Sequence, residues 1–71
     1  MSTYRKGELD TTDWLFYCKK NPIQAQRILG PFEVETREGT LICKDGYLAI
    51  DSRDFPYPID KEEFETIYEK V

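Results

Sequence analysis

Residues 57–71 constrain the fold more than any other stretch, because their local signals agree with one another. An extended Tyr-Pro-Ile step leads into Asp60, which has the chemistry of a helix N-cap. Glu63 stands three residues later, at the spacing of a capping box, and can reach back to the backbone N–H of Asp60. Ile59 and Phe64 have the spacing of a hydrophobic staple. The sequence therefore predicts a helix that begins directly after Asp60.

The predicted helix is amphipathic. Its apolar side chains recur at i, i+3, i+4 and i+7 and so share one face, which comprises Phe64, Ile67, Tyr68 and Val71. The chain is therefore expected to end in a short helix that packs on the rest of the domain.

The size of the chain allows one domain. Folding of a 71-residue chain buries only roughly 60% of the surface that the unfolded chain exposes, so the core must be rich in large side chains. Five Tyr, four Phe and one Trp supply such side chains. A core is expected without covalent staples.

The N-terminal part carries weaker signals. Residues 1–9 are polar and are expected to form a loosely held arm. The aromatic run at 14–18 favours a strand, with one turn of helix as the alternative. Residues 23–28 begin to alternate directly after Pro22 and are interpreted as a strand, because proline suits the first residue of a strand or an edge strand.

The centre of the chain gives the clearest β signals. Residues 32–36 alternate between apolar and polar, and 40–43 follow after a turn with Gly39 at the position that needs a positive φ, which predicts a hairpin. Asp45-Gly46 and residues 51–54 are two further turns, which lead into strands at 47–50 and 55–59.

Together these elements predict an α+β domain that is mostly β. We expect a small, strongly curved antiparallel sheet, an SH3-like open barrel, with a short C-terminal helix that covers an end or an edge. A flat three- or four-stranded sheet with the helix on one face is the alternative. Within the single domain, residues 1–18 would form the arm and aromatic segment, and 19–71 the β-meander with its helix.

Several of these residues also occur in a known pattern. It comprises Thr36-x-Glu38-Gly39, Gly46-Tyr47, Tyr57-Pro58-Ile59, Phe64 and Tyr68-x-x-Val71, with Lys19-Lys20-Asn21-Pro22-Ile23 before them. This pattern resembles the PGDYG family of small bacterial and phage proteins, and it covers roughly residues 19–71. Where that family usually carries Pro-Gly-Asp-Tyr, this chain has Lys44-Asp45-Gly46-Tyr47, one residue closer to the preceding Glu-Gly turn.

The resemblance implies a compact domain in which Tyr47, Tyr57, Phe64 and Tyr68 are recurrent positions. It brings no activity with it. A phage context favours proteins that act by binding a host protein, which is an association at the level of a class.

Catalytic and cofactor chemistry has little support in the sequence. The chain has no histidine, which removes the commonest general base at neutral pH and a frequent zinc ligand. Cys18 and Cys43 are interpreted as small hydrophobic residues with free thiols. Asp51, Asp54 and Asp60 fit no known cation-binding loop. We therefore expect a protein that is not an enzyme and holds no metal or cofactor.

The charge and hydropathy patterns limit the partners. The chain has 14 acidic and 10 basic residues and a net charge of −4, which argues against direct binding to a nucleic-acid backbone. The chain lacks an apolar run long enough for a membrane span, and residues 1–7 lack the apolar run of a signal peptide. A cytoplasmic protein is expected.

The candidate binding residues are aromatic side chains that stand next to acidic ones. Trp14 and Phe55 would contact a partner protein, with Asp51, Arg53 and Asp54 beside Phe55. The leading hypothesis is a noncatalytic interaction module that binds another protein through this surface or through an exposed strand edge.

Three alternatives remain open at this point. An acidic inhibitor that mimics nucleic acid on a host enzyme would gather its carboxylates on one face, with Glu62, Glu65, Glu69, Asp51 and Asp54 as the candidates. An unrecognised enzyme, or an accessory subunit of an enzyme, is the second. The third is a homodimer, whose formation the sequence does not decide.

Overall fold

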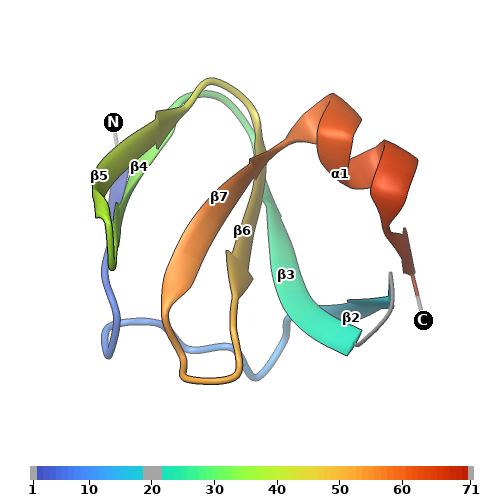
Figure 1. Ribbon diagram of the computed structural model, residues 1–71, viewed down its shortest axis with the longest axis horizontal. Helices are drawn as coiled ribbons and strands as arrows, with labels where there is room; N and C mark the ends of the chain where they lie inside the picture. Colours follow the sequence, from blue (N-terminus) through green and yellow to red (C-terminus); the bar gives the residue numbers. More distant parts are fainter. Residues whose placement is uncertain (1, 19–21, 71) are drawn as a thin grey trace.

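The computed structural model describes residues 2–18 and 22–70, which form a mostly-β domain (Figure 1). The strands are β1 (Ser2–Tyr4), β2 (Leu15–Cys18), β3 (Pro22–Ile28), β4 (Phe32–Thr36), β5 (Gly39–Cys43), β6 (Gly46–Ile50), β7 (Pro56–Asp60) and β8 (Glu69–Lys70). The helix α1 (Lys61–Ile67) follows β7 directly.

The strands form two sheets. The first has the order β1-β4-β5, in which β1 runs parallel to β4 and β5 runs antiparallel to it. The second is antiparallel and has the order β7-β6-β3-β2, and the two-residue β8 extends it beside β2. Strand β5 therefore lies at one edge of the first sheet, and β7 lies at one edge of the second.

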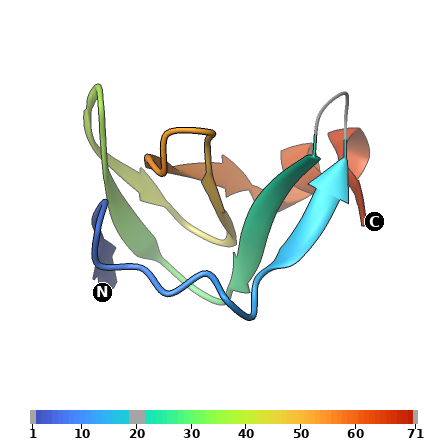
Figure 2. The ribbon, with the colours of Figure 1, turned by 90° about the horizontal axis from the view of Figure 1, so that it is seen from below.

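The two sheets share one long hairpin, whose arms are β3–β4 and β5–β6 and which bends at a corner. Ile28 pairs with Gly46 in the second sheet, and Phe32 pairs with Cys43 in the first. Between these pairs, residues 29–31 and 44–45 lie outside the strands and form the corner, where Gly30 has a positive φ of 77°. The hairpin changes direction at this interruption of the ladder, and Figure 2 shows the two halves inclined to each other.

The core lies on both faces of β6, because side chains alternate along a strand. Leu48 points toward the first sheet and is completely buried with Phe32 and Val34. On the other face Tyr47, Ala49 and Ala25 form a second cluster, which includes Phe64 of α1. The second sheet is thus covered by the helix on one face and by the first sheet on the other.

The expectation of a strongly curved, SH3-like open barrel is wrong. In the described part of the chain, neither sheet is closed or strongly curled. The physical reason is the interruption of the ladder at 29–31 and 44–45, which concentrates the change of direction at one corner instead of spreading it along the strands. The second sheet, with α1 against β6 and β7, corresponds to the alternative of a four-stranded sheet with a helix on one face.

Most of the predicted strands are confirmed, including β2 in the aromatic run and the β4–β5 hairpin, in which Gly39 has a φ of 113°. The N-terminal arm differs from the prediction, because β1 pairs with β4. Tyr4 packs edge-on against Phe32 with ring centroids 5.9 Å apart, and Thr3 donates to Glu33 at 2.8 Å. Contact with a buried ring holds this segment in place.

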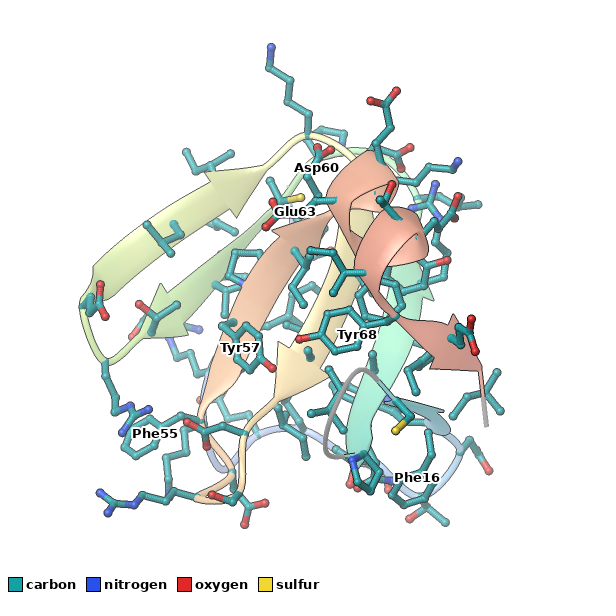
Figure 3. All side chains as sticks on the ribbon, turned by 45° about the vertical axis from the view of Figure 1, so that its right-hand side comes forward. Phe16, Phe55, Tyr57, Asp60, Glu63 and Tyr68 are labelled. Atoms are coloured by element: carbon teal, nitrogen blue, oxygen red, sulfur yellow. The ribbon has the colours of Figure 1, made fainter. Side chains whose placement is uncertain are left out.

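The helix begins after Asp60, as predicted, but the capping box is not formed. Asp60 makes no side-chain hydrogen bond to the helix, although it lies near Glu63 at the first turn (Figure 3). Instead, the N–H of Lys61 donates to the carbonyl of Asp45 at 3.2 Å. A residue of the corner thus takes part in holding the start of the helix.

The helix is shorter than predicted. It ends at Ile67, and Tyr68 is extended with φ −105° and ψ 144°, because the next residues pair with β2 as β8. Phe64 is buried as predicted, and Ile59 packs against the same cluster. Ile67 is 37% exposed, so it does not share the buried face. Val71 lies outside the described residues.

Candidate functional site

The two aromatic residues expected to face a partner lie in different environments. Trp14 is half-buried and packs against the cluster of Phe32, Val34 and Leu48. Phe55 is half-buried in the turn between β6 and β7, where Figure 3 labels it. The two rings line different hollows of the surface and do not form one patch.

Two cations contact the Phe55 ring. Lys6 Nζ lies 5.2 Å from the ring centroid, and Arg37 Cζ lies 4.9 Å from it. Both distances are within the range of a cation–π interaction. The ring therefore helps to tie the N-terminal segment and the β4–β5 loop to this turn.

The acidic neighbours of Phe55 have separate roles. Asp51 accepts hydrogen bonds from the N–H groups of Arg53 at 2.9 Å and Phe55 at 3.0 Å, and it pairs with Arg37 at 2.8 Å. Its carboxylate therefore stabilises the turn. Arg53 and Asp54 are exposed, and Asp54 has a positive φ of 64°.

A cluster of polar groups at the corner was not predicted. Arg27 donates to both carboxylate oxygens of Asp45, at 2.9 and 2.8 Å, and to the carbonyl of Gly46 at 2.9 Å. The N–H of Gly30 also donates to Asp45, at 3.1 Å. The hydrogen bond from Arg27 is the main cause that lowers the pKa of the Asp45 carboxyl. This bidentate pair fixes the corner at which β5 ends.

Strand β5 presents the most open apolar surface of the first sheet. Leu41 is 46% exposed and Ile42 is 64% exposed, although they point to opposite faces of the sheet. Leu41 pairs with buried Val34 and so points toward the core side, whereas Ile42 pairs with Glu33 on the outer side. Figure 1 places β5 at the left margin of the molecule.

The hairpin register shows which backbone groups of β5 face outward. A two-residue loop is closed by a pair that exchanges both backbone hydrogen bonds, here Thr36 and Gly39. Bonded and non-bonded pairs alternate, so Leu41 directs its N–H and C=O toward β4. Thr40 and Ile42 direct theirs to the free edge. The edge therefore offers two donors and two acceptors to a further strand.

The neighbouring edge strand β7 is less suited to pairing. It contains Pro56 and Pro58, which have no N–H to donate, and proline is a usual means of protecting an edge strand. Hollows of about 400 and 320 Å³ lie between β5 and β7, and Leu41 lines both. Side chains of a bound segment could therefore enter the molecule on either side of Leu41.

The two thiols are free, and Cys18 is half-buried whereas Cys43 is buried. Cys43 is buried at the corner end of β5, and burial raises the pKa of its thiol, so the reactive thiolate is disfavoured. Burial, together with a 2.9 Å hydrogen bond to Glu65, raises the pKa of Tyr47 to about 12. Both shifts favour the neutral form of a packed side chain.

The described residues define a class of protein, a small mostly-β domain with two sheets and a short helix near the C-terminus. No family model, curated protein or solved structure matches the chain. The resemblance to the PGDYG family therefore stays a prediction. Within the described residues, no helix is long and apolar enough to cross a membrane.

Proposed function

We propose that the chain is a noncatalytic interaction module that binds another protein chain by adding an extended segment to the free edge of β5. The observation that carries this proposal is the combination of outward N–H and C=O groups with apolar side chains exposed on both faces of the strand. Main-chain hydrogen bonds supply affinity in strand addition, and alternate side chains supply specificity.

The other edges in the described sheets fit this role less well. Strand β1 has three residues, and β7 carries two prolines. On the outer edge of β2, β8 pairs with Tyr17 and Cys18, which leaves only the two exposed residues Leu15 and Phe16 unpaired. Apolar edges without protection tend to associate with other chains, and β5 has five residues, no proline and two exposed apolar side chains.

The alternative of a nucleic-acid mimic finds less support. Asp51 and Asp54 lie in the turn between β6 and β7, whereas Glu62 and Glu65 lie on α1 at the opposite end of β7 (Figure 1). Asp51 and Glu65 are also paired, with Arg37 and Lys61 respectively. Dispersed and partly neutralised carboxylates do not present the continuous negative surface that such a mimic needs. The alternative of an accessory subunit is compatible with the proposal, because the enzyme would then be the partner that binds to β5.

The test uses a proline at position 42. Ile42→Pro removes an outward N–H and leaves the hydrogen bonds between β4 and β5 in place, so the domain should fold while its edge no longer pairs. Affinity capture from lysate of the native host, read by mass spectrometry, is expected to lose at least about nine tenths of each specific partner. Circular dichroism checks that the variant is folded.

The matched control is Ile42→Val, which keeps the N–H and the strand propensity at the same position. It is expected to capture the same partners as the original chain. Partners retained at full level by folded Ile42→Pro would overturn strand addition at β5.

A further inference from the structure

We propose that the strand added to the β5 edge is β5 of a second copy of this chain, antiparallel to the first and related to it by a twofold axis at Leu41. The inference rests on the proposed function and names the partner of the same edge. The result would be a continuous six-stranded sheet with the order β1-β4-β5 followed by β5-β4-β1 of the second copy.

The backbone sets the register of this pairing. Only Thr40 and Ile42 direct hydrogen-bonding groups outward from the centre of β5, so every hydrogen-bonded pair between two copies must use these positions. If Thr40 of one copy bonds with Ile42 of the other, the twofold axis repeats the same pair on its other side. Leu41 then faces Leu41 of the second copy in a non-bonded pair, in which side chains approach most closely.

Charge complementarity distinguishes this register from its neighbours. A position of β5 in one copy faces the position equally far on the other side of Leu41, so Gly39 faces Cys43 at each end of the pair. Glu38, in the turn just before β5, then comes close to Lys44 of the other copy, in the corner just after β5. Both residues are exposed, and within the described residues neither takes part in an ion pair. Slipping the strands by two residues, so that Thr40 faces Thr40 or Ile42 faces Ile42, removes both opposite-charge pairs. Self-pairing in the Leu41-centred register is therefore favoured at both ends of the strand.

The apolar surface has the same symmetry. Pairing covers Leu41 on the core side and Ile42 on the outer side, the two exposed apolar residues of β5. A pair of five-residue strands buries less than the roughly 1,200 Å² of a standard stable interface. The dimer is therefore expected to be weak and to form as the protein concentration rises, as in many transient associations.

The test is a charge exchange measured by sedimentation equilibrium up to about 1 mM protein, the concentration needed to detect weak association. In E38K and in K44E, like charges come close to each other at two symmetric positions, so dimerisation should weaken about tenfold. The double variant E38K/K44E restores opposite charges and should recover the original dissociation constant within about threefold. Only a self-pair in which these residues come close to each other predicts that recovery.

Two further samples make the outcome decisive. E62K, on α1 away from β5, changes the net charge as E38K does and should leave dimerisation unchanged. Ile42→Pro should abolish the dimer. A dimer that ignores the single exchanges, or that the double exchange does not restore, would overturn the register.

If the protein remains monomeric up to about 1 mM, the proposal that a second copy pairs with β5 is overturned. Capture of a different protein that is lost in Ile42→Pro would then leave the proposed function standing. A monomer with no capture sensitive to Ile42→Pro would overturn both.

Discussion

Phe64→Ala is expected to cost about 3 to 5 kcal/mol of unfolding free energy, because it removes the residue at the centre of the aromatic cluster under α1. Phe64 is 1% exposed and stacks on Tyr47 with ring centroids 3.8 Å apart and on Tyr68 at 4.8 Å. Tyr17 contacts the same ring edge-on at 4.8 Å. A chain of this size has a total stability of only about 4 to 10 kcal/mol, so the variant should be largely or wholly unfolded.

Urea denaturation followed by circular dichroism measures the effect. Phe64→Leu keeps an apolar side chain and should stay folded, with a loss of unfolding free energy below about 1.5 kcal/mol. This variant gives a measurable value if the alanine variant does not fold. Ile67→Ala is the control from the same helix and should change stability by at most about 0.5 kcal/mol, because this residue is partly exposed. Equal losses at positions 64 and 67 would contradict the described helix packing.

Gly46→Ala is expected to destabilise the protein by about 2 to 3 kcal/mol, because β6 and β7 approach closely at the corner. A Cβ at this position would overlap the carbonyl oxygen of Ile59 and lie 2.9 Å from Cys43 Sγ. The nearer atom belongs to the backbone of a paired strand, so it cannot move aside without disturbing β7. The same shift would strain the Asp45–Lys61 contact that holds the start of α1.

Thermal or urea unfolding of Gly46→Ala can be compared with Gly7→Ala. A Cβ at Gly7 meets no atom within 4 Å, and its positive φ of 84° should cost only about 1 to 2 kcal/mol. An unchanged unfolding midpoint for Gly46→Ala would mean that the two strands do not approach each other as described.

Local signals predicted much of the secondary structure. The alternation in 32–36 and the glycine at position 39 suffice for a hairpin, because the turn and both strands are adjacent in sequence. Asp60 was correctly placed before the helix for a similar reason, although its side chain does not cap it. Signals of this kind depend on neighbours a few residues away.

The remaining features depend on contacts between distant residues. The corner requires Arg27 to meet Asp45, which is 18 residues away, and no local pattern marks that pairing. The parallel pairing of β1 with β4 and the early end of α1 likewise result from strand partners far along the chain. For the proposed site, the sequence predicted an exposed strand edge as one option, but no local signal distinguishes the edge of β5 from the other strand edges. Trp14 and Phe55 looked equivalent because their neighbours, an apolar cluster for Trp14 and two cations for Phe55, are set by the tertiary fold.

Backbone amide hydrogen exchange along β5, measured by NMR in dilute and in concentrated protein, tests the open edge most directly. In dilute protein the N–H of Leu41 should be protected by β4, whereas those of Thr40 and Ile42 should exchange rapidly. At high concentration the N–H groups of Thr40 and Ile42 should become protected as the second copy pairs. Strong protection of Thr40 and Ile42 in the dilute monomer would contradict the account, because the edge would then already be occupied within the chain.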